Sequence, residues 1–468
     1  MDTKVLKNGY IEFCGYNATE VTGSANLVRF LQYHYLVDYG MRQTSDEEKD
    51  HVCNMKRHKS IKPKQLDGII LTHCHIDHSG LIPKLYAEGA NCPLYIPSGT
   101  KGLLTLMWQD SVKIFNHDYE RFDRKPLYTQ EDVENALKYV IECELYDRVN
   151  LNDKMNFTYI NAQHIVGARQ VFMECYDKAR MYRIGFTGDI SNYKSRYWLD
   201  NLDIMPKCNI VVGECTYANS NRNHSPRDRQ KDLDKIDYAV MRAKERNAKI
   251  IMPTFSLNRM QDVLAMLYEH FNGRAPIKIL VDSPLGMNIN KLWDDLIIKD
   301  FALWDKIKNW DNVYYIEDFK DSVHFSKLNE PLLVIAGGGM LRGGRARFWV
   351  KECVSEVDNV IMFTGYATPE SLAGRMRQGR GKYMQIDDKL VNNNALPMAL
   401  KSLSSHCDAT ELARYYTDIQ YNRIYLVHGD QDYKLKFAKE LQAKLERKDR
   451  TSRVICTQSD TKAYFSKK

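Results

Sequence analysis

Short runs of apolar residues recur along the chain, and a polar turn follows each of them. Runs of this length that are rich in Ile and Val are typical of buried strands. The pattern therefore predicts strands at residues 67–73, 183–189, 209–214, 249–255, 278–284, 331–339, 359–366 and 422–429.

Amphipathic segments separate several of these runs, and the clearest are residues 233–247 and 259–273. We expect both to be helices, because their apolar positions recur at helical spacing. In the second segment, Gly273 follows the last apolar position and is expected to end the helix. The apolar face of that helix comprises Met260, Val263, Leu264, Leu267 and Phe271. Alternating strands and helices indicate an α/β protein.

Acidic and imidazole side chains gather near the ends of the apolar runs. In α/β proteins, ligands bind beyond the carboxyl ends of the strands. Six such side chains at strand ends therefore suggest one shared site. They are Asp38, His73, His164, Asp189, Glu214 and His428.

The most crowded stretch is LTHCHIDHSG, residues 71–80. It brings four metal-binding groups together within six residues: His73, His75, Asp77 and His78. Imidazoles and carboxylates are costly to desolvate together, and a dication removes that cost. The alternative, a polar cap for a helix that begins at Ser79, accounts for only one of the four.

The HCHIDH segment resembles the HxHxDH signature of metallo-β-lactamase-fold hydrolases. In that family the first two histidines bind one metal ion, and the Asp–His pair binds a second. Three further stretches resemble the family in chain order, namely LVDYG with Asp38, QHIVGA with His164 and FTGDI with Asp189. The resemblance implies that Asp38 supports the site, that His164 is a further ligand and that Asp189 bridges both ions.

Three more motifs resemble the β-CASP branch of that superfamily. They are VVGECTYAN with Glu214, SLSSHCDATEL with His406 and LVHGD with His428. A histidine in the third motif is similar to the RNA-acting members, whereas DNA-acting members carry valine there. The segments AGGGM, SLAGR and SSHCD depart from the usual family wording. These departures bear on the choice of substrate, since the metal ligands are intact.

The resemblance implies two divalent metal ions, with Zn²⁺ expected and Mn²⁺ as the alternative. A hydroxide that bridges the two ions would attack the phosphate, and Asp77 would also orient it. His406 is the candidate general acid, with Glu214 fixing its tautomer. For His406 the alternative is a polar helix cap. The implied ligands are His73, His75 and His164 for one ion, Asp77, His78 and His428 for the other, and Asp189 for both.

The segment AGGGMLRGGR follows a predicted strand and is expected to open a helix. Glycines there would let backbone N–H groups approach a phosphate, although a plain tight turn explains them as well. Basic side chains could clamp phosphates or track an RNA backbone. The candidate substrate-binding residues are Gly338, Gly339, Arg259, Arg345 and Arg375.

The fold implied by the resemblance is an α/β metallo-β-lactamase αββα sandwich that an inserted α/β β-CASP domain interrupts. We expect the metallo-β-lactamase domain at residues 1–217 and 395–468, and the β-CASP domain at residues 218–394. The catalytic site is expected in the cleft between the two domains.

A net charge of +7 permits an anionic partner, but it is too small for a dedicated nucleic-acid-binding domain. The eleven cysteines form no CxxC pair, which indicates free thiols in a reducing, cytoplasmic setting. The N-terminal residues lack an apolar signal core, and the longest apolar stretch is too short to cross a bilayer. We therefore expect no membrane partner.

The family resemblance implies a metal-dependent ribonuclease that hydrolyses single-stranded RNA as an endonuclease, a 5′-exonuclease or both. One alternative is a small-molecule or DNA hydrolase of the same fold, and the long insert and His406 argue against small substrates. The other is a non-catalytic RNA-processing subunit, against which the complete ligand set argues. The sequence is also compatible with a homo-oligomer.

Overall fold

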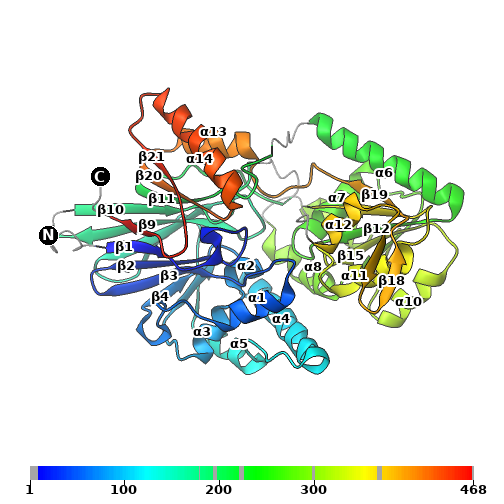
Figure 1. Ribbon diagram of the computed structural model, residues 1–468, viewed down its shortest axis with the longest axis horizontal. Coiled ribbons are helices and arrows are strands. Elements are labelled where there is room, and N and C mark those ends of the chain that lie inside the picture. The colour runs from blue at the N-terminus through cyan, green and yellow to red at the C-terminus, as the bar shows by residue number, and fades with distance from the viewer. Residues whose placement is uncertain are drawn as a thin grey trace. The chain divides into compact units, whose positions relative to one another are not determined.

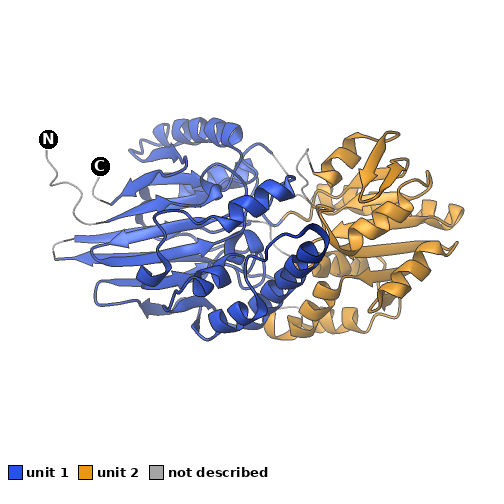
Figure 2. Cartoon of the chain, turned by 60° about the horizontal axis from the view of Figure 1, so that its bottom comes forward, with its two compact units in different colours: residues 1–195, 199–221, 405–468 blue, residues 196–198, 222–404 orange. Residues whose placement is uncertain are grey.

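The computed structural model describes residues 9–178, 180–192, 198–220, 226–297, 301–365 and 371–465. The chain divides into two compact units (Figure 2). The first unit comprises residues 1–195, 199–221 and 405–468, and the second unit comprises residues 196–198 and 222–404. The predicted domain boundaries at residues 217/218 and 394/395, and the predicted cleft site, stay predictions.

The first unit contains two seven-stranded sheets. The order of the first sheet is β22-β1-β2-β3-β4-β5-β6, with β1 (Gly9–Phe13), β2 (Ala25–Phe30), β3 (Tyr33–Tyr39), β4 (Gly68–Ile70), β5 (Leu94–Pro97), β6 (Val140–Cys143) and β22 (Lys462–Tyr464). The order of the second sheet is β21-β20-β11-β10-β9-β8-β7, with β7 (Arg148–Asn150), β8 (Met155–Asn161), β9 (Arg169–Asp177), β10 (Arg180–Phe186), β11 (Cys208–Glu214), β20 (Tyr421–Val427) and β21 (Arg453–Cys456).

The core of the first unit lies between its two sheets. Apolar side chains of both sheets, such as Val28 and Val37 from one and Phe157 and Ile210 from the other, form one buried cluster. Helices cover the outer faces (Figure 1). On the side of the first sheet are α1 (Glu47–Met55), α3 (Ile82–Ala87), α4 (Lys101–Phe122) and α5 (Gln130–Leu137), and on the side of the second are α13 (Ala409–Asp418) and α14 (Gln431–Glu446). This is the αββα arrangement that we predicted.

The second unit is built on a six-stranded sheet of order β14-β13-β15-β12-β16-β19, in which every pairing is parallel. Its strands are β12 (Lys249–Thr254), β13 (Lys278–Asp282), β14 (Val313–Tyr315), β15 (Leu332–Gly337), β16 (Val360–Phe363) and β19 (Leu396–Ala399). A separate hairpin joins β17 (Tyr383–Ile386) and β18 (Lys389–Asn392). Its helices are α6 (Pro226–Arg246), α7 (Arg259–His270), α8 (Pro284–Leu296), α9 (Phe301–Lys308), α10 (Phe319–Lys327), α11 (Gly344–Cys353) and α12 (Leu372–Gln378). The α/β class is confirmed.

All eight predicted strands are present as β4, β10, β11, β12, β13, β15, β16 and β20. The helix predicted over residues 259–273 is α7, and Gly273 follows it with a φ of 70°. The helix predicted over residues 233–247 begins earlier, at Pro226. The added residues, PRDRQKD, are polar and charged, so the apolar pattern gave no sign of them. Within the described ranges, every helix is too short or too polar to cross a membrane.

Candidate metal centre

Three histidines and an aspartate, the set predicted for one metal ion, converge on one point of the first unit. His73 follows β4, His75 directly precedes α2 (Ile76–Ser79), and His164 follows β8. The Nδ1 atom of His75 lies 3.2 Å from Nε2 of His73 and 3.1 Å from Nε2 of His164. Oδ2 of Asp189 lies 3.7 and 3.6 Å from the same two Nε2 atoms. A tetrahedral zinc site with bonds of about 2.0–2.1 Å has ligand-to-ligand edges of about 3.3–3.4 Å, so this spacing suits one ion.

The second group joins Asp77 and His78 of α2 with His428, which follows β20. Nε2 of His428 lies 3.1 Å from Oδ2 of Asp77, and its Nδ1 lies 3.4 Å from Oδ1 of Asp189. Nε2 of His78 lies 3.4 Å from the same Asp189 oxygen. Asp189 therefore turns Oδ2 toward the first group and Oδ1 toward the second.

The buried carboxylate of Asp189 shows that these residues fit a metal centre. Its Oδ1 atom is buried and has no hydrogen-bond partner. An ionised oxygen in that position is costly to bury, whereas a cation between the two groups would satisfy it. The donor set combines five imidazoles with two carboxylates, which is the kind of set that zinc prefers.

Charge differs between the two groups. Burial lowers the pKa of His75 to about 4 and holds the pKa values of His73 and His164 well below the ordinary value. Burial opposes charge on His78 and His428 as well, but Asp189 and the neighbouring carboxylates together outweigh it and raise the pKa of both. Cations bound among these carboxylates would replace the protons of the second group.

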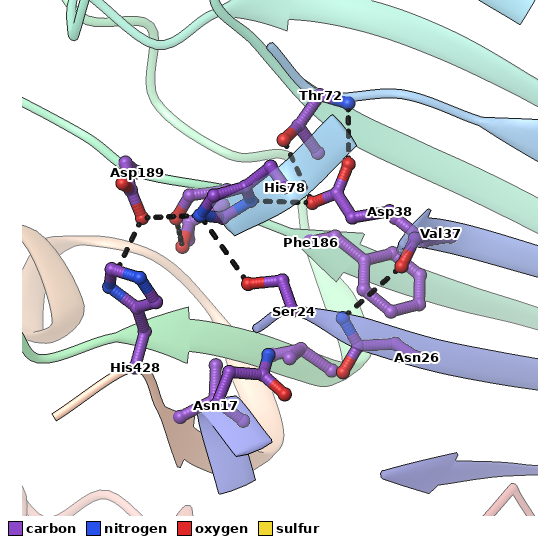
Figure 3. Close-up of a pocket in the computed structure, with 14 residues that line it drawn as sticks. Asn17, Ser24, Asn26, Val37, Asp38, Thr72, His78, Phe186, Asp189 and His428 are labelled. Carbon is purple, nitrogen blue, oxygen red and sulfur yellow. Dashed lines mark hydrogen bonds and ion pairs between the residues drawn. The ribbon is translucent and has the colours of Figure 1, made fainter. Parts of the chain in front are cut away.

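The carboxylate of Asp38 contacts Nδ1 of His78, the ring nitrogen that faces away from Asp189, as Figure 3 shows. Nδ1 of His78 lies 2.9 Å from Oδ2 of Asp38. Oδ1 of Asp38 accepts a hydrogen bond from the backbone N–H of Thr72 at 2.8 Å, and Oδ2 accepts one from the Thr72 hydroxyl at 2.9 Å. Asp38 has a φ of 60°, a conformation that costs energy for a residue other than glycine. A carboxylate that accepts from Nδ1–H leaves Nε2 free for a metal ion, which suits the supporting role predicted for Asp38.

His406 and Glu214 form a pair beside the metal-binding groups. Nδ1 of His406 lies 3.1 Å from Oε1 of Glu214, and its ring centroid lies 4.4 Å from that of His164. Glu214 ends β11, is 1% exposed and accepts backbone hydrogen bonds from Ile190 at 2.8 Å and Thr216 at 3.1 Å. The carboxylate is therefore fixed, and it fixes the imidazole in turn.

Sequence reasoning missed three groups that orient the histidines. The hydroxyl of Thr216 lies 2.9 Å from Nδ1 of His428, and the backbone carbonyl of Ser405 lies 2.5 Å from Nδ1 of His164. The backbone N–H of His428, at a φ of 53°, donates to the carbonyl of Asn17 at 2.6 Å. Thr216 lies in the motif of Glu214, and Ser405 lies in the motif of His406. Their closeness in sequence to predicted site residues could have pointed to both. Asn17 lies in no such motif.

A small cavity lies behind His78, and Figure 3 shows the side chains around it. Its volume is about 20 Å³, and its polar lining includes Asn17, Ser24 and Asn26. A space of that size holds about one water molecule. The cavity is therefore part of the support of the centre and is too small for a substrate.

Two of the arginines predicted to bind substrate make contacts inside the second unit. Arg259 is buried at the start of α7, and its Nη1 donates to the carbonyl of Thr364 at 2.5 Å. Nη1 of Arg345, in α11, donates to the hydroxyl of Ser322 at 2.7 Å, and its Nε lies 3.6 Å from Oδ1 of Asp282. These contacts give both guanidinium groups a structural role, and the phosphate role stays a prediction.

The predicted glycine loop follows β15 and opens α11, as expected. Gly338 has a φ of 120°, and a Cβ atom there would lie 2.5 Å from the carbonyl oxygen of Gly343, so glycine is required. Gly339 packs against the ring of Phe255, which a Cβ atom would approach to 3.2 Å. Arg375 is exposed on α12. A tight turn accounts for these glycines as well as a phosphate does.

Models of three protein families match the chain. The metallo-β-lactamase superfamily model matches residues 18–136, and the Beta-Casp domain model matches residues 260–376. The model described as a Zn-dependent metallo-hydrolase RNA specificity domain matches residues 399–451. That last range contains both His406 and His428.

Curated relatives extend the similarity over most of the chain. Ribonuclease TTHA0252 of Thermus thermophilus is 28% identical over 432 residues, which cover 91% of this chain and 94% of that protein. Transcription termination factor FttA of Methanococcus maripaludis is 26% identical, over 87% of this chain and 66% of that protein. FttA of Methanothermobacter thermautotrophicus is 28% identical, over 78% of this chain and 58% of that protein. The chain thus spans nearly all of the Thermus protein but two thirds or less of these two FttA proteins.

A solved structure shares the fold across both units. It is the crystal structure of a protein of unknown function from Enterococcus faecalis, with a TM-score of 0.53 and 11% sequence identity. The match covers 97% of this chain and 99% of that one. Since the family models fall on both units and the ligand groups contain the family's signature, the chain belongs to the metallo-β-lactamase superfamily, within its β-CASP family of metallo-hydrolase nucleases.

Proposed function

We propose that this chain is a ribonuclease that hydrolyses the phosphodiester bonds of single-stranded RNA with two zinc ions. The observation that carries the proposal is the meeting of two ligand groups at Asp189, beside the pair of His406 and Glu214. The RNA specificity domain match, which includes His406 and His428, supports RNA as the substrate. Eleven unpaired cysteines support a reducing setting, and we place the enzyme in the cytoplasm.

The residues around the two groups have separate tasks in this reaction. Two zinc ions, when bound, supply the charge that activates water at neutral pH and stabilises the phosphate oxygens. The carboxylate of Asp77 accepts a hydrogen bond from the attacking water and orients it. His406 donates its Nε2 proton to the departing 3′-oxygen, while Glu214 at Nδ1 stabilises the imidazolium form before that transfer. The products carry a 5′-phosphate and a 3′-hydroxyl.

Digestion of three RNAs of one sequence tests the activity and its mode. The substrates are a 5′-triphosphate RNA, a 5′-monophosphate RNA and a circular RNA, with products mapped at each nucleotide. Cleavage of the circle requires endonuclease action, and stepwise loss from the monophosphate end requires 5′-exonuclease action. The matched control is Asp77→Asn, which keeps the shape of the side chain but removes its charge. Three intact substrates, or equal cleavage by the control, would exclude the proposal.

The metal stoichiometry is tested separately by replacing the shared ligand. Because Asp189 faces both groups, Asp189→Ala should remove close to two zinc equivalents per chain relative to the wild-type protein. Elemental analysis of both proteins, purified in parallel without added metal, measures the difference. Retention of both equivalents by the variant would contradict the shared-ligand assignment.

A further inference from the structure

A second group of metal-binding side chains lies where β1 pairs with the edge strand β22, and it shares no residue with the centre described above. Glu12 belongs to β1, Cys14 follows that strand directly, and His58 lies in the segment between α1 and β4. Each offers one ligand atom, and the three atoms all lie within 4.8 Å of one another. We call this group the edge site.

We propose that the edge site binds a zinc ion through the carboxylate of Glu12, the thiolate of Cys14 and Nδ1 of His58. Sulfur, imidazole nitrogen and carboxylate oxygen are the three donor types that zinc uses in proteins. The inference is independent of the proposed nuclease activity, because it concerns different residues and a different role.

Glu12 supplies the observation that points to a cation. Its side chain is 2% exposed, and its Oε2 atom is buried without a hydrogen-bond partner. The other oxygen, Oε1, accepts a hydrogen bond from the hydroxyl of Ser60 at 2.8 Å and lies 3.7 Å from Nζ of Lys462. Because Oε2 is buried and has no hydrogen-bond partner, it would be satisfied by a metal ion.

The two ring nitrogens of His58 have different partners. Nε2 faces the carboxylate of Asp460, and Nδ1 is the nitrogen that we propose binds the metal ion. Nε2 lies 2.5 Å from Oδ1 of Asp460, so the imidazole proton belongs on Nε2. Nδ1 accepts only a long hydrogen bond, 3.3 Å, from the backbone N–H of Ser60, and it therefore carries a lone pair. Metal-binding histidines usually donate their second N–H to a carboxylate in this way, which fixes the tautomer and strengthens the ligand. Asp460 is thus the positioning residue of the edge site.

An ion at this position would join segments that are far apart in the chain. His58 and Asp460 are separated by 402 residues, and Glu12 pairs with Lys462 in the register of β1 and β22. Because the second unit interrupts the first, non-covalent contacts hold the first and last segments of the first unit together. A metal ion there would tie β1 directly to the segment that follows α1, and it would support the last strand through the hydrogen bond between His58 and Asp460.

Cobalt substitution separates the edge site from the catalytic centre without any assay of activity. Thiolate ligation gives Co²⁺ an intense charge-transfer band in the near ultraviolet, which sites of nitrogen and oxygen ligands lack. All the predicted ligands of the catalytic centre are histidines and aspartates, and Cys14 is the only thiol in the metal-binding groups of the described residues. The wild-type protein loaded with Co²⁺ should therefore show the band.

Matched variants identify the source of that band. Cys14→Ser should abolish it and remove one metal equivalent, whereas Cys53→Ser, at a cysteine of similar partial burial on α1, should leave both unchanged. Asp460→Asn, at a side chain that is 55% exposed, should weaken cobalt binding by about 10–100-fold without unfolding the protein. Asp189→Ala should keep the band while it loses catalytic metal, so failure of one assignment leaves the other standing. A wild-type protein without the band, or a Cys14→Ser variant that retains it, would overturn the proposal.

Discussion

The contact between Glu214 and one ring nitrogen of His406 defines the proposed task of that histidine. Nδ1 lies 3.1 Å from Glu214, so Nε2 is the nitrogen that can protonate a leaving oxygen. We expect His406→Ala to lower the cleavage rate by roughly 10²–10⁴, the usual range for loss of a general acid. Single-turnover kinetics on an RNA with one cleavable bond measures the loss.

A substrate with sulfur in place of the bridging 3′-oxygen distinguishes proton donation from substrate binding. Sulfur leaves without a proton, so His406→Ala should cleave this substrate at close to the wild-type rate. Asp77→Asn is the control, because a variant of the metal centre should not be rescued. An equal loss on both substrates would remove His406 from the acid role and leave the metal assignment unchanged.

At the scale of secondary-structure elements, a close backbone contact between the end of β3 and α2 sets the position of Asp77 and His78. Gly40 follows β3, and a Cβ atom there would lie 1.7 Å from the carbonyl oxygen of Asp77 in α2. Gly40→Ala must therefore displace α2 and with it the predicted metal ligands Asp77 and His78. We expect the variant to lose most of its bound zinc and its activity, as measured by elemental analysis and cleavage assays.

The control for that substitution is Gly343→Ala. Gly343 has no heavy atom within 4 Å of an added Cβ, so this variant should keep the wild-type zinc content. If Gly40→Ala also kept its zinc, the close approach of β3 to α2 would not determine the geometry of the centre.

Helix α7 contains a buried acid that makes the second unit sensitive to pH. Burial raises the pKa of Asp262 from 3.8 to about 6. The folded state therefore favours the protonated form, and this stabilisation is complete below about pH 4 and is lost as the pH rises through about 6. Asp262→Asn, which stays neutral, should gain stability on the order of 3 kcal/mol over the wild-type protein at pH 8 and little near pH 4.

Urea unfolding followed by tryptophan fluorescence measures this difference, since Trp293, Trp304 and Trp349 lie in the second unit. Asp311→Asn, at an exposed aspartate of the same unit, should leave the pH dependence unchanged. A stability difference between Asp262→Asn and wild type that is the same at both pH values would show that Asp262 does not titrate in this range.

At the scale of the whole molecule, the choice of nucleic acid is the property to test. His428 and the RNA specificity domain match favour RNA over DNA of the same sequence. We expect a preference of at least about tenfold, the effect of one contact to a 2′-hydroxyl of ~1.4 kcal/mol. Cleavage rates of matched single-stranded RNA and DNA give the ratio. Equal rates would instead group the protein with nucleases that act on DNA.

The sequence by itself predicted the class of the fold, eight of its strands and the side chains that meet in the two ligand groups. Apolar runs predicted the eight strands because a strand buried on both faces needs a continuous run of such residues. The segment HCHIDH predicted the centre because burying four imidazole and carboxylate groups so close together is costly, and a bound cation would remove that cost. The first turns of α6 are polar and lack an apolar pattern, so the sequence predicted the helix to begin several residues too late.

Only the tertiary structure decided how those ligands are held. The Thr216 hydroxyl at His428, the Ser405 carbonyl at His164 and the Asn17 carbonyl are contacts between distant segments, and local patterns do not encode them. The edge site is a further case, because Glu12, Cys14 and His58 belong to no recognisable spacing in the chain. The pairing of β1 with β22 places Glu12 beside the last segment of the chain. The distance in space between two residues depends on how the strands pair, and the number of residues between them in the sequence does not reveal it.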